Sequence, residues 1–471
     1  MSSPLTRFKA AVADATSNEA RRDFIYKALG GYYVSRDKNK NNFRDWQKAR
    51  ECAAQTKYES LNNLAEELEI FSKKIEGRGG HVFFASTPSE AREYILKVAR
   101  DNGVKKIIKS KCMTSEEIHL NDALEAAGTE VVESDLGEFI QQLRKEPPFH
   151  FVFPCMHVKR DEINTLFQEN IHSRDTNNPA ELTMIAREYL RQKYIDADMG
   201  ITGANFIVAR DGMISVTENE GNSRLSAAMP KIHLVLVGIE KVVPRLEDLA
   251  LFLPMLATAG AGQPLTGYNT QYAGPRTAEN PDGPEQFHVV LLDNNRTQLL
   301  ADAEHRDALH CMRCGACLNV CPVFKNIGGL SYGTTYQGPI GSLITPHLRG
   351  TKNWQHLSYS SSLCGACTQA CPVKIDIHDH LLENRRNAAT LAPSILWKMI
   401  FFGFNFIFAH PKLYALTFKI AKKINPLTKL AGKVPGTLLY GWTGTRKLPE
   451  PPKSSFRERF AEHKKQDLSV R

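Results

Sequence analysis

The stretch that decides the fold of the last third of the chain is Cys311-Met-Arg-Cys314-Gly-Ala-Cys317-Leu-Asn-Val-Cys321-Pro322. Its spacing, C-x2-C-x2-C-x3-C-P, lets three thiolates wrap one face of a cubane iron–sulfur cluster. Gly315 and Ala316 keep this loop small, so that backbone N–H groups can approach the cluster sulfides. The fourth cysteine, which precedes a proline, is carried away from the loop and ligates a second cluster. The motif therefore predicts an α-helical two-cluster ferredoxin domain.

A second, shorter motif follows about forty residues later and reads Cys364-Gly-Ala-Cys367-Thr-Gln-Ala-Cys371-Pro372. It lacks the leading cysteine, and Ser361 stands at that position in register. The glycine-rich segment between the motifs either wraps the clusters, meets a partner or simply connects the two halves. Reciprocal pairing gives cluster 1 the ligands Cys311, Cys314, Cys317 and Cys371, and cluster 2 the ligands Cys321, Cys364 and Cys367.

Cluster 2 therefore has only three thiolates, and the sequence leaves its fourth iron open. Ser361, another residue, water or a partner's side chain could bind that iron. The iron could also be absent, which would make cluster 2 a [3Fe-4S] cluster beside a [4Fe-4S] cluster 1. Either change would separate the reduction potentials of the two clusters, because ligand type and net charge set them.

Structural zinc is the other interpretation of clustered cysteines. Zinc sites use four ligands, usually as two C-x2-C pairs, and seven cysteines with two C-x3-C-P ends do not divide in that way. The remaining cysteines, Cys52, Cys112 and Cys155, are scattered. The segment Met1–Lys9 lacks the apolar core of a secretory signal. We therefore expect a cytoplasmic protein whose cysteines are kept reduced.

The composition is that of a globular protein whose positive charge lies at one end. The 471 residues, 42 % hydrophobic and 24 % charged, include 60 Lys+Arg and 51 Asp+Glu. Residues 391–471 hold 15 of the basic and 4 of the acidic residues, so the body is nearly neutral and the tail is basic. This distribution argues against a nucleic-acid-binding protein and favours a basic C-terminal docking surface.

The pattern of apolar residues divides the chain into four regions, namely a helical arm (1–70), an α/β domain (71–300), the two-cluster domain (301–390) and a basic, aromatic C-terminal region (391–471). Strands that alternate with helices in the second region predict a parallel sheet. Expected strands cover residues 81–85, 104–108, 129–133, 149–153, 232–237 and 289–292, expected helices 87–102, 114–127 and 179–194, and a hairpin joins 206–209 to 213–217.

Neither a G-x-G-x-x-G after a strand nor a P-loop motif occurs in the sequence. We therefore expect no dinucleotide and no P-loop nucleotide to be bound by this chain. If a flavin takes part in the reaction, the sequence predicts that another chain carries it.

The C-terminal region begins with an aromatic stretch. Ile395–Ala409 contains only Lys398 and Asn405 as polar residues, and its 15 residues are fewer than the roughly 20 that a spanning helix needs. From Asn384 to Pro449 there are eleven Lys+Arg and no acidic residue. This bias fits peripheral contact with an anionic membrane or an acidic partner. A buried helix under a basic rim is the other interpretation.

Several segments outside the cysteine motifs resemble the lactate utilization protein B family. Lys109–Leu120, Gly200–Phe206, Thr217–Asn222, Pro230–His233 and Gly238–Pro244 look like its LUD domain, and Phe324–Gly333 looks like the segment behind its ferredoxin motif. The resemblance runs from about residue 20 to 450. It implies an α/β fold of the CoA-transferase and sugar-phosphate-isomerase type.

The same resemblance implies a function. The chain would be the iron–sulfur electron-transfer subunit of a complex that oxidises L-lactate to pyruvate and allows growth on lactate. Companion lactate utilization proteins A and C are the implied partners, and the electron acceptor stays unknown. Two other functions fit the motifs. One is an iron–sulfur subunit of a glycolate-oxidase-like or heterodisulfide-reductase-like complex, and the other is a non-redox binding protein with structural or sensory clusters.

Lactate oxidation needs a base and a cation that anchors the carboxylate. The α/β domain contains candidate bases and candidate cations, but these residues also have a structural interpretation. An acidic pair at the start of a helix, for example, interacts favourably with the helix dipole. The sequence therefore assigns no catalytic residue. The candidate acids and bases are Glu116, Glu117, His119, Glu218 and Glu220, and the candidate cations are Lys109, Lys111, Arg224 and Lys231.

Overall fold

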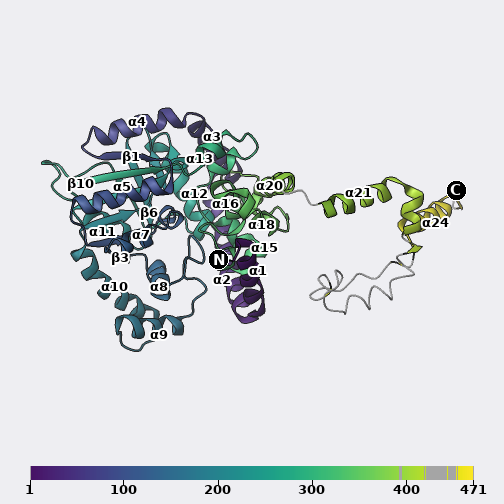
Figure 1. Ribbon diagram of the computed structural model, residues 1–471, viewed down its shortest axis with the longest axis horizontal. Helices are drawn as coiled ribbons and strands as arrows, with labels where there is room; N and C mark the ends of the chain where they lie inside the picture. The colour runs from purple at the N-terminus through teal and green to yellow at the C-terminus, as the bar shows by residue number, and fades with distance from the viewer. Residues whose placement is uncertain are drawn as a thin grey trace. The chain divides into compact units, whose positions relative to one another are not determined.

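The computed structural model describes residues 2–391, 395–417, 419–420, 443, 452 and 454–469. The chain divides into two compact units, residues 1–391 and residues 392–471. The first unit holds both the sheet and the helices that carry the cysteine motifs (Figure 1).

A six-stranded sheet forms the centre of the first unit, and every pair of neighbouring strands in it is parallel. This confirms the predicted α/β class. All seven residues of β7 are buried, as the apolar run, interrupted only by His233, predicts for a strand covered on both faces. In spatial order the strands are β1 (His81–Ala85), β10 (Gln286–Leu292), β7 (Ile232–Gly238), β4 (Met199–Thr202), β2 (Lys106–Lys109) and β3 (Glu130–Glu133).

Helices connect these strands. The first begins as its sequence predicts, because the Thr87 side chain accepts a hydrogen bond from the backbone of Glu90 and Pro88 occupies the first turn. The helix expected over residues 114–127 is instead two helices, since His119 adopts a left-handed backbone conformation (φ 52°). The helices are α5 (Pro88–Asp101), α6 (Met113–Glu117), α7 (Leu120–Ala126), α8 (Leu136–Arg144), α9 (Arg160–Ile171), α10 (Pro179–Asp196), α11 (Asn222–Ala228) and α13 (Arg296–Ala301).

A second, four-stranded sheet lies in the order β8 (Val242–Val243), β5 (Phe206–Val208), β6 (Met213–Glu218) and β9 (Tyr268–Tyr272). Strands β5 and β6 are antiparallel, which confirms the predicted hairpin. The helix α12 (Leu249–Ala261) packs against this sheet through Phe252, whose ring lies 5.3 Å from that of Phe206.

The strand expected over residues 149–153 is wrong, because this segment is a buried turn. The backbone N–H groups of Val152 and Phe153 donate to the His150 Nδ1 atom, at 3.0 and 3.2 Å, rather than to a neighbouring strand. The His150 Nε2 atom lies 3.1 Å from the Asn319 amide oxygen. The aromatic residues of the segment therefore pack between the α/β domain and the helices of the cysteine motifs.

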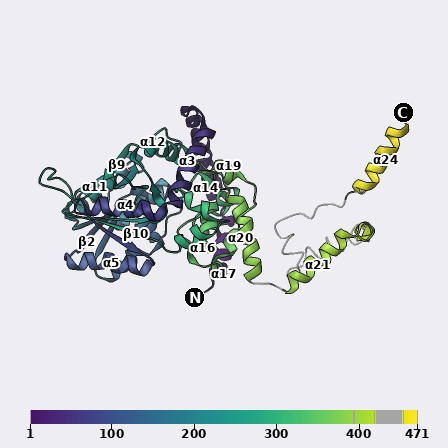
Figure 2. The ribbon, with the colours of Figure 1, turned by 90° about the horizontal axis from the view of Figure 1, so that it is seen from above.

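The cysteine motifs lie on short helices beside the sheet domain, and α14, α16, α19 and α20 form one group in Figure 2. This arrangement confirms the predicted helical domain. Gly260 of α12 packs so closely on the first motif that an added Cβ atom would lie 2.4 Å from the Cys314 carbonyl oxygen. The elements are η4 (Arg306–His310), α14 (Ala316–Val320), α15 (Pro322–Ile327), η5 (Leu330–Tyr332), α16 (Gly338–Arg349), α17 (Thr351–Trp354), α18 (His356–Tyr359), α19 (Ala366–Ala370) and α20 (Ile377–Leu391).

The N-terminal arm is helical and belongs to the same core. Ile25, Phe206, Phe324 and Leu381 are members of one connected hydrophobic cluster, so the arm, the α/β domain and the cysteine domain share their interior. The helices of the arm are α1 (Pro4–Ser17), α2 (Glu19–Asn39), η1 (Lys40–Asn42), α3 (Trp46–Asn62) and α4 (Leu64–Glu76), and the short elements η2 (Ile239–Lys241) and η3 (Leu246–Asp248) flank β8.

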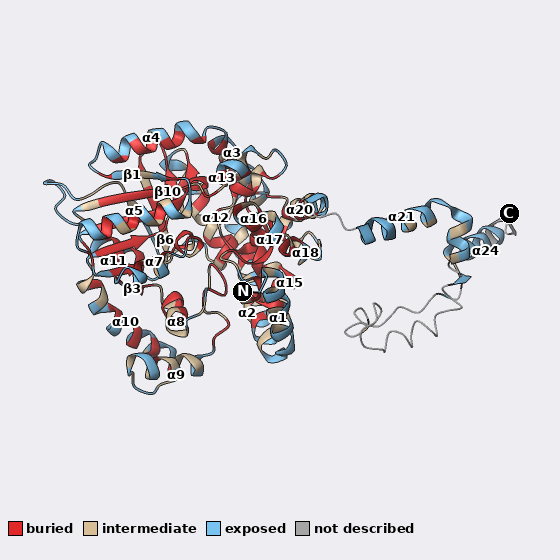
Figure 3. Cartoon of the chain, in the orientation of Figure 1, coloured by how far each residue is buried: buried red, intermediate tan, exposed pale blue. Residues whose placement is uncertain are grey.

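The second unit contains α21 (Ile395–Ala409) and α24 (Phe456–Ser469) among its described residues. None of the residues of α21 is buried (Figure 3), and Trp397, Phe401 and Phe402 are each more than half exposed. In the described part of the chain no single helix is long and apolar enough to cross a membrane, and α20 and α21 meet the criteria of length and composition only when taken together.

Candidate metal centre and adjoining pocket

The two cysteine motifs adopt the same backbone conformation. Gly315 and Gly365 have left-handed φ angles of 79° and 78°, and Arg313 and Leu363 have φ angles of 59° and 53°. Each glycine is followed at once by a short helix, α14 or α19. Positive φ is costly for a residue with a side chain, so its repetition at Arg313 and Leu363 indicates that both loops are shaped to aim their cysteines in the same way.

Four cysteines line one small apolar cavity, and they come from both motifs. Cys311, Cys314 and Cys317 belong to the first motif and Cys371 to the second. Burial raises the pKa of the Cys314 thiol to about 12, and burial followed by the neighbouring Cys314 and Cys311 thiols raises that of Cys371. A metal cluster would therefore displace protons from this cage when it binds, as thiolate ligation requires.

The sulfurs of this cage also accept backbone hydrogen bonds. The Arg313 N–H donates to Cys311 Sγ and the Ile375 N–H donates to Cys371 Sγ, both at 3.4 Å. Such N–H···S bonds stabilise thiolate charge and tune the potential of a bound cluster. The donor set fits an iron–sulfur cluster.

The other three cysteines form a second group. Burial foremost, then Cys321 and Cys364, raise the pKa of Cys367 to about 12. Cys364 is exposed, whereas Cys321 and Cys367 are buried. The Cys367 thiol also raises the pKa of Cys317, after burial and the nearer thiols of its own cage. The two groups are thus neighbours, and the second of them reaches the surface of the protein.

Ser361 takes the position in the second motif that Cys311 takes in the first. The Leu363 N–H donates to Ser361 Oγ at 3.1 Å, just as the Arg313 N–H donates to Cys311 Sγ at 3.4 Å. The Arg385 guanidinium donates to the Ser361 carbonyl oxygen at 2.7 Å and holds this turn in place. The two turns therefore make the same backbone hydrogen bond, with the Ser361 hydroxyl in the role of the Cys311 thiol.

The thiols are spread more widely than a zinc site requires. With Zn–S distances of about 2.3 Å, sulfurs around a tetrahedral zinc lie about 3.8 Å apart. Among the described residues, the cysteine sulfurs form no group of three within 4.8 Å of one another. The cages are thus wider than zinc sites, in agreement with the spacing of the motifs.

The glycine-rich segment between the motifs is buried inside the first unit. An added Cβ at Gly329 would lie 1.6 Å from the Phe149 carbonyl oxygen, and one at Gly341 would lie 1.9 Å from that of Tyr336. The backbone of Ile340 bonds to the Cys317 sulfur. Of the interpretations that the sequence left open, this contact favours a segment that wraps the first cage.

A chain of buried charges joins the α/β domain to the first motif. Arg296, 1 % exposed, pairs with Glu117 at 2.8 Å and with Glu240 at 2.6 Å. Arg313 pairs with the other oxygen of Glu240 at 3.2 Å, and Tyr336 donates to Glu117 at 2.7 Å. Burial alone would raise the pKa of Glu240, but Arg296 and Arg313 lower it to about 2.

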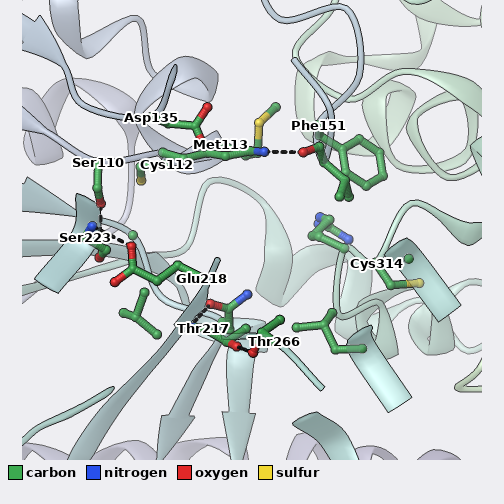
Figure 4. A pocket seen from close by; sticks show the side chains of 18 of the residues that line it. Ser110, Cys112, Met113, Asp135, Phe151, Thr217, Glu218, Ser223, Thr266 and Cys314 are labelled. Carbon is green, nitrogen blue, oxygen red and sulfur yellow. Dashed lines mark hydrogen bonds between the residues drawn. The ribbon is translucent and has the colours of Figure 1, made fainter. Parts of the chain in front are cut away.

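A pocket of about 400 Å³ lies where the parallel strands end. Ser110 and Lys111 follow β2, Gly203 follows β4, and Lys241 follows β7. The carboxyl ends of parallel strands are the usual place for ligands in open α/β sheets. Figure 4 shows Ser110 and Ser223 on one side of this pocket and Cys314 on the other.

The pocket brings together three of the candidates named from the sequence, Lys111, Glu218 and Glu220. Glu218 accepts hydrogen bonds from the backbone of Ser223 and Arg224, at 2.7 and 3.0 Å, and so caps α11. Burial and the nearby Asp135 raise the pKa of Glu220 to about 7.

The other candidates lie elsewhere. Glu117 belongs to the buried charge chain, and His119 and Lys231 are exposed. Lys109 is buried in an ion pair with Glu133 at 2.8 Å, and the Arg224 guanidinium lies over the Tyr268 ring.

Sequence reasoning missed three charged residues that line the pocket, namely Asp135, Lys241 and Arg313. A signal was present for one of them, because Lys241 lies three residues beyond the carboxyl end of the fully buried strand β7. Arg313 lies inside the first motif, where only the cysteines were predicted to be functional. Asp135 precedes α8, whose N-terminus it caps.

Comparison with known proteins agrees with this architecture. Residues 68–292 match the model of the LUD domain, residues 307–375 match a 4Fe-4S dicluster domain, and residues 377–465 match "Lactate utilisation protein B, C-terminal". The fold and the cysteine site thus define a LUD-domain protein with a helical iron–sulfur domain.

Relatives that match over nearly their whole length show which family within this class the chain belongs to. The chain is 41 % identical to lactate utilization protein B of Bacillus cytotoxicus over 467 residues, and 41 % identical to that of Bacillus cereus over 468 residues, with 98 % of each chain covered. The chain belongs to the lactate utilization protein B family. A solved structure, a DUF162 family protein from Deinococcus radiodurans, shares 13 % identity and a TM-score of 0.27 with this chain, over 49 % of this chain and 98 % of its own.

Proposed function

We propose that this protein is the iron–sulfur electron-transfer subunit of a system that oxidises L-lactate to pyruvate. The observation that carries the proposal is the pair of neighbouring cysteine cages, one buried and one open to the surface. Membership of the lactate utilization protein B family supports L-lactate as the substrate of this system. A bound cluster takes up and releases one electron at a time, so two adjacent clusters can accept the pair of electrons that leaves lactate.

In this proposal Cys311, Cys314, Cys317 and Cys371 hold a [4Fe-4S] cluster 1. Cluster 2 is held by Cys321, Cys364 and Cys367, and Ser361 Oγ supplies its fourth ligand. The support for Ser361 is the hydrogen bond from Leu363, which matches that from Arg313 to Cys311. Because Cys364 is exposed, a cluster held by Cys321, Cys364 and Cys367 would be the one within reach of the next electron carrier.

Replacing Ser361 with cysteine is expected to raise the reduction potential of cluster 2 and to protect it from losing an iron in air. An anionic oxygen ligand stabilises oxidised iron more than a thiolate does. Redox titration followed by EPR measures both effects. Ser360→Cys is the matched control, since Ser360 is one residue out of register and its hydroxyl donates to the His356 carbonyl oxygen at 3.0 Å. Equal changes in the two variants, or no change in Ser361→Cys, would contradict the assignment.

The companion lactate utilization proteins A and C are the proposed partners, and electrons enter from them or with their help. The test is anaerobic reconstitution of the three proteins followed by addition of L-lactate. We expect the visible absorption of the clusters to bleach, and a strain that lacks this protein to lose growth on lactate. Clusters that stay oxidised with both partners present would refute the proposal.

The second unit is proposed to hold the protein at the cytoplasmic face of an anionic membrane. Its support is α21, whose large apolar side chains are exposed, together with the basic residues around it. Truncation after Leu391 is expected to move the protein from the membrane fraction to the soluble fraction, since the apolar face and the charge attraction are both lost. Cell fractionation with immunoblotting measures this, and unchanged fractionation would show that the tail is no anchor.

A further inference from the structure

The pocket at the ends of β2, β4 and β7 holds a cation that the fold leaves unpaired. Lys241 lines the pocket and is 8 % exposed. Within the described part of the chain, its ammonium makes no hydrogen bond and no ion pair. A buried charge is costly unless it has a partner. Glu240 and Cys311 act on this ammonium without forming an ion pair with it, so an anion in the pocket would supply the direct partner.

The other two cations of the pocket are already engaged. The Lys111 ammonium donates to the Val152 carbonyl oxygen at 2.6 Å, and the Arg313 guanidinium is paired with Glu240. The carbonyl fixes the position of Lys111 without neutralising its charge. Among the described residues that line the pocket, Lys241 is the cation that has neither a hydrogen bond nor an ion pair to give up to a ligand.

Three carboxyl groups, those of Asp135, Glu218 and Glu220, lie around the same pocket. Like charges at close range are costly in a partly buried site, so a dianion such as phosphate is disfavoured. A monoanion with a hydroxyl group beside its carboxylate fits this charge pattern, because its carboxylate can pair with the ammonium and its hydroxyl can donate to one of the three carboxyl groups. An oxo group only accepts, and its donor would be the protonated carboxyl of Glu220, whose pKa burial and Asp135 raise to about 7.

We propose that this pocket binds a 2-hydroxy or 2-oxo acid, with its carboxylate on the Lys241 ammonium. The choice of acid rests on the proposed function, whereas the unpaired cation and the pocket do not. The volume of about 400 Å³ lies within the range of small-molecule sites. It exceeds the need of a three-carbon acid, so water or a second reactant shares the space.

The bound acid would be next to cluster 1. Met312 and Cys314 line both this pocket and the cavity of the four cluster 1 cysteines. An electron added to that cluster repels a nearby carboxylate, so the acid binds the oxidised protein more tightly than the reduced protein. By linkage, the acid lowers the reduction potential of cluster 1 by the same free energy.

The test is calorimetric titration of L-lactate and of pyruvate, separately, into the anaerobically purified protein with its clusters. Lys241→Gln is expected to weaken binding about tenfold or more, because a charge-assisted hydrogen bond is lost. Lys241→Arg should retain most of the affinity. Lys105→Gln, which alters an exposed lysine at the opposite end of β2, should bind as the unaltered protein does. Dithionite reduction should weaken binding about fivefold or more.

Two results would overturn the proposal. The unaltered protein could bind neither acid, or Lys241→Gln could bind them undiminished. In the second case, a shifted EPR spectrum of cluster 1 would assign Lys241 to balancing the charge of the cluster. Each of these leaves the proposed function standing if lactate still reduces the clusters in the reconstituted system.

Discussion

Replacing Cys371 with serine is expected to alter cluster 1 and to spare cluster 2, although Cys371 belongs to the second motif. Its thiol lines the cavity shared with Cys311, Cys314 and Cys317. A serine there would replace one thiolate by an oxygen ligand or release one iron. The expected result is a changed EPR signal and a lowered potential for one cluster, while the other keeps its own.

The EPR signals of single variants in both motifs show to which cluster Cys371 belongs. Cys314→Ser should change the same EPR signal as Cys371→Ser, because both ligands belong to cluster 1. Cys364→Ser should change the other signal. Cys52→Ser, at an exposed cysteine outside the motifs, should change neither. Should Cys371→Ser instead share its signal with Cys364→Ser, the ligands would be grouped by motif, and the reciprocal assignment would fall.

Replacing Arg296 with methionine is expected to destabilise the protein by about 3–5 kcal/mol, because it leaves buried carboxylates without their partner. Arg296 is 1 % exposed and binds Glu117 and Glu240 at once. Glu240 is also the ion-pair partner of Arg313 in the first cysteine motif. The loss should therefore loosen the α/β domain and the cluster domain together, in one unfolding transition.

Chemical denaturation of the anaerobic protein, followed by far-UV circular dichroism and by cluster absorption, measures this effect. Arg276→Ala is the control, since the ion pair of Arg276 with Glu285 is largely exposed and such pairs contribute at most about 1 kcal/mol. Arg296→Met that costs no more than Arg276→Ala would show that the buried chain is not stabilising. Separate transitions for the two signals would show that the domains unfold independently.

The parts of the fold that the sequence predicts well are those where a local pattern meets a general rule. The apolar run at 232–237, interrupted only by His233, predicts a buried parallel strand, and β7 is one. The same reasoning fails at 149–153, because apolar residues there fill an interface between domains and the His150 side chain bonds the backbone. Periodicity alone does not distinguish these two uses of apolar residues.

In the site, too, the features that follow from a local pattern were predicted and those that depend on distant residues were not. The order of the cysteines suggested which of them belong together, since the spacing of ligands on a short loop is local chemistry. The pocket residues come instead from strands, helices and a loop far apart in the sequence. Glu117 looked like a candidate acid because its partners, Arg296 and Tyr336, are about 180 and 220 residues away. Lys241 was not among the predicted cations, because a lysine can be recognised as unpaired only when its surroundings are known.

The most direct test of the two-cluster assignment is iron and acid-labile sulfide analysis, combined with EPR, on protein purified without oxygen. We expect iron and sulfide sufficient for two clusters, and two EPR signals that interact on full reduction because the cages are neighbours. An iron-free preparation that still supported lactate oxidation with its partners would contradict it, and so would zinc in place of iron and sulfide.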